Sequence, residues 1–271
     1  MTQLQSGAAA DPLPAVAPNP IALAVDDVTK SFGSIVAIQG ASLAVAAGRV
    51  TALVGDNGAG KSTLVKIMSG LLAPDSGSVL VDGRPVTLRD PRSARQHGIH
   101  TVFQDLGLVG SLSIVENMFL CSEIRLRAMG MRTPFLDREA MRTAARKALD
   151  NLGITTVKDI DAPVESLSGG QRQSVAIARA VREHARVVIL DEPTAALGVA
   201  QAAQVLRLME RLRASGTGVL VVSHNLREVF AVSDAVVVLR LGKVAQVFET
   251  SQTSEEEVVG AIVGAKSKVR A

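Results

Sequence analysis

The 271-residue chain contains no Trp and no Tyr, and Phe supplies only six aromatic rings. Since 47% of the residues are nevertheless hydrophobic, the core must be built from Val, Leu, Ile and Ala. Any site that requires an aromatic ring therefore has only Phe or His available. The length allows one large α/β domain with an inserted subdomain, or two small domains that share a surface.

Cysteine is almost absent as well, because Cys121 is the single thiol. This excludes an internal disulfide framework and fits a reducing compartment. We interpret Cys121 as a small, buried apolar side chain. Long apolar runs are missing too: one of the most apolar, 187–190, is far too short to cross a bilayer. If the protein works at a membrane, a partner must supply the span.

The N-terminal segment contains no basic residue before Lys30. The segment lacks the features of a secretory signal or a transit peptide, so we expect the mature chain to start where the sequence starts. The net charge of +3 is small, and the basic residues are scattered without aromatic neighbours. This distribution argues against nucleic-acid binding.

The local patterns predict an α/β chain behind a flexible tail. Residues 1–20 are rich in Ala and Pro and show no apolar periodicity, which is typical of a flexible segment. Strands are predicted at 21–28, 50–54, 187–190, 219–222 and 235–239, the later ones buried on both faces. The dipeptides Asp82-Gly83 and Leu241-Gly242 predict antiparallel hairpins beside a mostly parallel sheet.

Helices are predicted from apolar residues at steps of three and four. One runs from Asp137 as N-cap to Gly153 as terminator, and a second runs from about Val199 to Leu212. In the C-terminal segment 250–271, Ser254 and Glu257 form a possible capping box for a short helix, which a basic tail follows. Between about 105 and 166 the strand signals largely disappear, which predicts a helical insertion in the α/β core.

The sharpest motif is GDNGAGKST at 55–63, between a predicted strand and an apolar helix. This is the context of a phosphate-binding P-loop. Its glycines let backbone N–H groups turn toward a β-phosphate, and the helix N-terminus adds a positive dipole. Lys61 would reach the β- and γ-phosphates of a nucleotide, and Ser62 would ligate Mg²⁺.

A second motif is VVILDE at 187–192, a buried strand that ends in two carboxylates. The carboxyl end of such a strand is where open α/β sheets bind ligands. We expect Asp191 to hold the magnesium and Glu192 to orient and deprotonate an attacking water. A third motif, LSGGQ at 167–171, opens a helix; taken alone, it is a cap and a flexible turn.

The order P-loop, Gln104, LSGGQ, VVILDEP and His224 resembles that of ABC-type ATPases over residues 21–249. The resemblance implies a P-loop ABC cassette with a RecA-like, mostly parallel core, an antiparallel β-subdomain and an inserted helical subdomain at about 105–166. Two cassettes of this family meet head to tail with ATP between the P-loop of one and the signature motif of the other. With one copy of each motif, the chain should form a homodimer or pair with a second cassette chain.

The resemblance also carries over residue roles. The catalytic set is Glu192, Lys61, Gln104 as γ-phosphate sensor and His224 as the residue that stabilises charge on that phosphate. The magnesium ligands are Ser62, Gln104 and Asp191. The residues expected at the nucleotide are Phe32, Gly55, Asp56, Asn57, Gly58, Ala59, Gly60, Lys61, Ser62 and Thr63, with Ser168, Gly169, Gly170 and Gln171 from the opposite chain.

Three further positions bear on this assignment. Phe32 falls where the family usually has a Tyr that stacks on adenine; a core Phe at a hairpin is the alternative. Gly198 replaces the Asp that usually follows TAAL, which puts communication between the two active sites in doubt. His97, His100 and His184 have no comparable context, and we interpret them as ordinary surface or core residues.

A narrower resemblance is to the ATP-binding subunits of ribose- and fructose-type sugar importers. It rests on GDNGAGKST, the stretch 103–120, TAALG and VSHNLREVFAVSD at 222–234. It implies partner permease subunits, indirectly a sugar-binding protein, and a place on the cytoplasmic face of the inner membrane. The permease is expected to dock at 105–118, with Leu106, Leu108 and Val109 as candidates; a core role for the leucines is the alternative.

Two other functions use the same residues. A chromosome-maintenance or repair ATPase would clamp DNA, but such proteins usually insert long coiled coils between P-loop and signature, and this chain shows no heptad run there. A nucleotide-gated regulator would bind ATP without hydrolysis, against which the presence of Glu192 and His224 argues.

Overall fold

The computed structural model describes residues 19–128, 131–182, 185–195 and 197–265. The predicted N-terminal tail, apart from its last two residues, the basic C-terminal tail and His184 lie outside the described residues. No helix in these ranges is long and apolar enough to cross a bilayer.

A six-stranded sheet forms the centre of the molecule, in the order β12-β11-β3-β10-β9-β6. All neighbours are parallel except the edge pair β11 and β12, which is antiparallel. The strands are β3 (Val50–Val54), β6 (Ile99–Val102), β9 (Val187–Asp191), β10 (Gly218–Val222), β11 (Ala235–Arg240) and β12 (Lys243–Glu249). The mostly parallel core predicted from the sequence is therefore confirmed.

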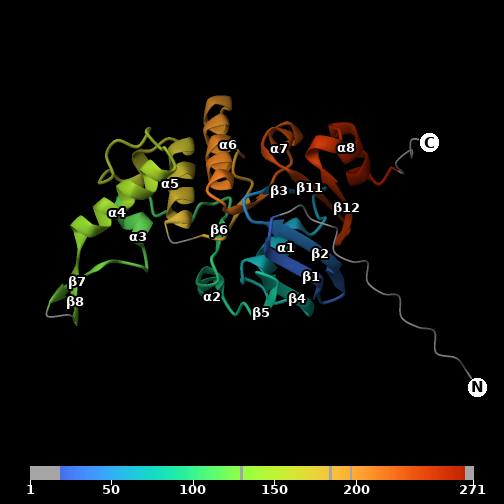
Figure 1. Cartoon of the computed structure of the whole chain (residues 1–271), viewed down its shortest axis with the longest axis horizontal. Coiled ribbons are helices and arrows are strands. Elements are labelled where there is room, and N and C mark those ends of the chain that lie inside the picture. Colours follow the sequence, from blue (N-terminus) through green and yellow to red (C-terminus); the bar gives the residue numbers. More distant parts are fainter. Residues whose placement is uncertain (1–18, 129–130, 183–184, 196, 266–271) are drawn as a thin grey trace, which may run out of the picture.

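A four-stranded antiparallel sheet, ordered β2-β1-β4-β5, covers one side of this core (Figure 1). Its strands are β1 (Ile21–Phe32), β2 (Ile35–Ala46), β4 (Ser76–Val81) and β5 (Arg84–Val86). Both hairpins predicted from dipeptides are present, and all four turn residues have positive φ, as a type I′ turn requires. The first strand is longer than predicted, since it continues to Phe32 through several bulges.

Eight α-helices lie within the described residues, with two short 3₁₀ turns at Val164–Ser166 and Thr250–Gln252. The helices are α1 (Lys61–Met68), α2 (Pro91–Gln96), α3 (Ile114–Phe119), α4 (Arg138–Asn151), α5 (Gly169–Val181), α6 (Val199–Ala214), α7 (Leu226–Val232) and α8 (Glu255–Val263). The predicted caps are confirmed: Asp137 accepts from Ala140 N at 3.0 Å, and Ser254 with Glu257 forms the capping box.

The central sheet is buried on both faces because alternate residues of each strand enter different hydrophobic cores. In β9 and β10, Val188 and Val219 belong to one core, whereas Ile189 and Leu220 belong to the other. The first core packs against α3 to α7, and the second packs against α1 and the antiparallel sheet (Figure 1). This double burial explains why these strands are continuous apolar runs.

Helices α3, α4 and α5 form a lobe beside the sheet, as the helical insertion required (Figure 1). The insertion also contains one feature that the sequence patterns did not indicate, since β7 (Arg125–Ala128) and β8 (Met131–Leu136) form a two-stranded antiparallel hairpin there. β7 is only four residues long, and β8 contains Pro134, which argues against a strand, so the pair gives a weak strand signal in the sequence.

Cys121 also departs from expectation, because its side chain is exposed rather than buried. It follows the end of α3 with a positive φ of 63°, and this turn directs the chain out of the core toward the hairpin.

Removal of a central side chain tests this arrangement of cores. Leu220→Ala deletes a fully buried side chain in the middle of β10, and we expect it to lower the free energy of unfolding by about 2–5 kcal/mol. Val199→Ala, at a side chain that is 90% exposed, is the matched control and should leave it almost unchanged. Urea denaturation measures both; equal losses would contradict the double-core description.

Candidate active site

The loop 55–60 connects β3 to α1 with a backbone that only glycine tolerates at two points. Gly55 has φ of 153°, and a Cβ there would lie 2.1 Å from the carbonyl oxygen of Leu239. At Gly60, φ is 105°, and a Cβ would lie 2.6 Å from the carbonyl oxygen of Ala37 on β2. Both collisions are with backbone, which cannot move aside cheaply. The glycines therefore fix the path that leads the loop into the N-terminus of α1.

Lys61, the first residue of α1, folds back over this loop. Its Nζ donates hydrogen bonds to the carbonyl oxygens of Gly55 at 2.7 Å and Asp56 at 3.0 Å. The amide of Asn57 is bonded to the Asp56 carboxylate at 2.8 Å. The loop thus places an ammonium group and the first amides of a helix side by side, which is the chemistry that binds a polyphosphate.

Asp191 ends β9 in a partly buried position next to this loop. Burial, and then the charge of Glu192, raise the pKa of the Asp191 carboxyl, while Lys61 and Lys66 act in the opposite direction. The influence of Lys61 shows that the end of β9 and the P-loop share one electrostatic environment. A carboxylate in such surroundings is stabilised by a cation.

Glu192 and His224 come together from two neighbouring strands. Glu192 follows β9, and its amide donates to the carbonyl oxygen of Val222 at the end of β10 at 3.0 Å. Nδ1 of His224 lies 2.8 Å from Oε2 of Glu192, in position to donate a hydrogen bond to it. The carboxylate of Glu192 is mostly buried, whereas the imidazole is largely exposed. This pair is able to hold a water molecule and to accept its proton.

Glu192 also has a positive φ of 50°, which is uncommon for a residue with a side chain. Such strain costs about 1–3 kcal/mol and is concentrated at functional sites. The turn directs the chain away from β9 immediately after the two carboxylates, and Leu197, two residues before α6, lies beside Gly169 of α5.

Sequence reasoning missed two residues that connect this loop to the neighbouring helix α7. Thr194 Oγ1 donates to Oε2 of Glu228 at 2.5 Å. Glu228 lies on α7, one turn after His224, so this bond ties the segment that follows Glu192 to the segment that follows His224. Both residues lie in segments that carry the family resemblance, TAALG and 222–234, and each follows the end of a parallel strand, but nothing in the sequence pairs them.

The signature motif lies on the helical lobe, away from the P-loop. Ser168 caps α5, because its Oγ accepts a hydrogen bond from the amide of Gln171 at 3.3 Å. In return, the amide of Ser168 donates to Oε1 of Gln171 at 2.9 Å. A Cβ on Gly170 would lie 2.9 Å from Cβ of Gln201, so this glycine allows α5 and α6 to approach closely. Helix α5 packs against α3, α4, α6 and β6, whereas α1 packs against β1, β2 and β9.

The other predicted residues lie outside the P-loop. Gln104 is exposed in the segment after β6. Phe32 ends β1 at the β1–β2 hairpin and is 51% exposed, so the alternative of a core Phe is wrong. The hairpin lies beside the P-loop, because β2 passes next to Gly60. Among the other histidines, His97 is exposed and His100 is buried, as expected of ordinary surface and core residues.

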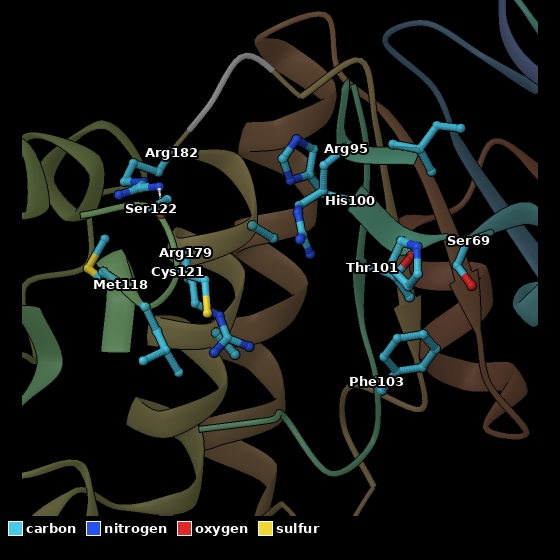
Figure 2. Close-up of a pocket in the computed structure, with 15 residues that line it drawn as sticks. Ser69, Arg95, His100, Thr101, Phe103, Met118, Cys121, Ser122, Arg179 and Arg182 are labelled. Atoms are coloured by element: carbon cyan, nitrogen blue, oxygen red, sulfur yellow. Dashed lines mark hydrogen bonds between the residues drawn. The ribbon is translucent and has the colours of Figure 1, made fainter. Parts of the chain in front are cut away.

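A cleft of about 310 Å³ separates β6 and α2 from the helical lobe. Figure 2 shows Thr101 and Phe103 on one side, and Met118, Cys121 and Arg182 on the other. Arg179 of α5 lies inside and donates to the carbonyl oxygens of Leu106 and Gly107, both at 2.7 Å. It therefore connects the signature helix to the loop that carries Gln104.

The family model described as ABC transporter matches residues 38–195 of this chain. The chain is 43% identical over 244 residues to the fructose import ATP-binding protein FrcA of Rhizobium meliloti, covering 90% of this chain and 94% of that protein. It is 44% identical over 236 residues to the xylose/arabinose import ATP-binding protein XylG of Sulfolobus acidocaldarius, covering 87% and 91%. It also matches 47% of the ribose import ATP-binding protein RbsA of Rhodococcus jostii, at 41% identity over 89% of this chain.

Solved structures agree with these sequence relatives. A crystal structure of a nucleotide-free ATP-binding cassette from an ABC transporter superposes with a TM-score of 0.75 at 27% identity, covering 90% of this chain and 95% of that one. A dimeric cassette in a post-hydrolysis state bound to ADP and Pi superposes with a TM-score of 0.68 at 26% identity, covering 84% and 98%.

The bonds of Lys61 predict that its ammonium carries nucleotide affinity. Lys61→Ala removes the ammonium group, which can exchange its bonds to two loop carbonyls for bonds to a phosphate. We expect the affinity for ATP to fall by about tenfold or more, because a hydrogen bond to a charged group contributes roughly 1.5–3 kcal/mol. Titration with a fluorescent ATP analogue measures this. Lys147→Ala, at an exposed lysine on α4 in the helical lobe, is the control. An unchanged affinity in Lys61→Ala would remove the lysine from this role.

The Glu192 and His224 pair predicts a separation of binding from turnover. Glu192→Gln keeps the size of the side chain and a hydrogen-bond acceptor but removes the base, so we expect ATP to bind normally while phosphate release slows by about 10²–10⁴-fold. Single-turnover phosphate release measures the slow step. Glu210→Gln, an exposed carboxylate on α6, is the control. Wild-type turnover in Glu192→Gln would show that another group accepts the proton.

Proposed function

Since the chain belongs to the ABC transporter family and is an ATPase cassette, we propose that it hydrolyses ATP to energise the import of a sugar through partner permease subunits in the membrane. The observation that carries this proposal is the likeness over nearly the full length of two sugar-import ATP-binding proteins, together with a site in which P-loop, Asp191, Glu192 and His224 are all present.

The nucleotide is held first by the P-loop. Its triphosphate takes hydrogen bonds from the backbone amides at the N-terminus of α1, and Lys61 exchanges its bonds to the loop carbonyls for bonds to phosphate oxygens. The adenine stacks on Phe32, whose ring is exposed beside the loop and lies 6.0 Å from Nζ of Lys30.

The oxygen donors around Asp191 fit a magnesium ion. Ser62, Gln104 and Asp191 offer a hydroxyl, an amide oxygen and a carboxylate, the ligand types that Mg²⁺ prefers. Burial and Glu192 raise the pKa of the Asp191 carboxyl, which a nearby cation would offset. When bound, the ion neutralises charge on the transferred phosphate. Within the described residues there is no cluster of three or more His, Cys, Asp or Glu side chains that could hold a metal ion by themselves.

Glu192 accepts the proton of the attacking water, while His224 fixes the Glu192 carboxylate and stabilises charge at the γ-phosphate. Ser168 and Gly170 lie on the other lobe of the same chain, so they act on the nucleotide of an opposing cassette. We therefore propose a homodimer or a pair with a second cassette chain, as in the dimeric cassette that this fold resembles. The loop 193–198 lies between the two half-sites of such a dimer.

The permease docks in the cleft between β6, α2 and the helical lobe. The cleft combines apolar surface from Phe103, Met118 and Leu120 with the cations Arg95 and Arg179. Burial, and to a smaller extent Arg95, lowers the pKa of the Arg179 guanidinium, so an acidic side chain on the partner would be favoured there. The predicted docking residues Leu106 and Leu108 pack against the core instead, and Val109 remains exposed.

In this proposal the chain works on the cytoplasmic face of the inner membrane, and a sugar-binding protein acts on the permease from outside. The alternative of a DNA-clamping ATPase is not favoured, because the insertion between P-loop and signature contains no helix longer than the 14 residues of α4 in the part that the structure describes.

Arg95→Glu tests this function. Proteoliposomes that contain the cassette with its co-purified permease should accumulate labelled sugar when ATP is supplied. Transport should fall by at least tenfold in Arg95→Glu, because the reversed charge repels the acidic side chain that we propose on the permease. The hydrolysis rate of the isolated cassette should not change. Arg92→Glu on the same helix is the control. Export instead of uptake would contradict the proposed function. Equal transport by both variants would contradict the proposed docking site.

A further inference from the structure

The β7–β8 hairpin has a composition that folding does not explain. Residues 124–136 contain three arginines, seven apolar residues and no acidic residue. The nearest carboxylates, Glu123 and Asp137, stand at the base of the hairpin, where the amide of Asp137 donates to the carbonyl oxygen of Ile124 at 2.8 Å. The hairpin is therefore a cationic and apolar projection.

Several apolar side chains of the two strands lie in solvent. Met131 and Phe135 are each 70% exposed, and Leu126 is 44% exposed. The strands are held by their own ladder and by a bond from Thr133 Oγ1 to the carbonyl oxygen of Leu126 at 2.9 Å. An isolated two-stranded hairpin is marginally stable in water, and polar residues would serve it equally well. Apolar residues in this position indicate a surface that another body covers.

The position of the hairpin relates it to the cleft. The segment 120–122, which leads from α3 into β7, lines the cleft, and Figure 1 shows the hairpin extending beyond α3, away from α6, α7 and α8. A permease segment seated in the cleft would therefore bring the hairpin next to the membrane. This placement rests on the proposed function, whereas the affinity of the hairpin for its target does not.

We propose that the β7–β8 hairpin binds the surface of an anionic lipid membrane, with Arg125 and Arg127 at the headgroups and Met131 and Phe135 in the interfacial layer. The cytoplasmic leaflet is negative, and each basic residue close to it contributes about 1 kcal/mol. Exposed Phe and Leu side chains add affinity at the interface. The negative leaflet is complementary in charge to the two arginines, and its interfacial layer accepts the exposed apolar side chains. Both features of the hairpin therefore favour a lipid surface.

Vesicle co-sedimentation of the full purified chain tests this proposal without a permease. The chain should bind vesicles of phosphatidylcholine with phosphatidylglycerol, bind vesicles of phosphatidylcholine alone poorly, and lose binding as salt rises. Since one arginine corresponds to a factor of about five in partition, Arg125→Glu with Arg127→Glu should weaken binding by at least about 25-fold. Met131→Ser with Phe135→Ser should weaken binding with less dependence on salt.

The matched control is Arg146→Glu with Arg207→Glu, which reverses two exposed arginines on α4 and α6 and changes the net charge equally. It should bind as the wild type does. Phosphate release should be unchanged in all variants, which shows that they fold. The proposal fails if the wild type ignores anionic vesicles, or if the hairpin variants and the control bind equally. It also fails if no form of the chain binds lipid while the hairpin variants, and not the control, fail to co-purify with the permease.

Discussion

The parallel pairing of β3, β10 and β9 is the constraint on which the site depends. Leu53 and Asp191 stand opposite the same residue, Val222, in the ladder. The P-loop, the two carboxylates and His224 therefore leave the sheet at one edge, within reach of one another, although they are far apart in sequence. A register shift of one residue would send the side chains of these strands to the wrong cores, so the double burial of the sheet also fixes the site.

Around this edge the backbone is held in unusual conformations that the packed sheet maintains. Gly55 passes against the backbone of Leu239, Gly60 passes against that of Ala37, and Glu192 takes a positive φ. Each conformation is unfavourable by itself and persists because a rigid scaffold surrounds it. The same rigidity keeps the loop amides and Lys61 in place before a ligand arrives, which lowers the ordering that binding must overcome.

The sequence was most informative for features that depend on neighbouring residues in the chain, such as strand periodicity and helix capping. The apolar runs of β9 and β10 predicted strands buried on both faces, and Asp137 predicted the start of α4, because strand period and capping are local properties. The exposed Cys121 and the β7–β8 hairpin were missed because neither contributes to a core. The contacts of Thr194 with Glu228, and of Arg179 with the loop after Gln104, depend on tertiary packing and have no local signature. The residues that we expect to carry the chemistry could thus be named from the sequence, but those that connect them could not.

The connections bear on the replacement of an Asp by Gly198. This glycine begins α6 with ordinary extended φ and ψ values, and a Cβ there would meet no atom within 4 Å, so sterics do not require it. Its loss of a capping carboxylate costs only a few tenths of a kcal/mol. Meanwhile the same loop is tied to α7 through Thr194, and its end touches the signature motif through Leu197 against Gly169 and Gln201 against Gly170. The described residues of this loop thus contact both α7 and the signature segment of the same chain, with no carboxylate at position 198.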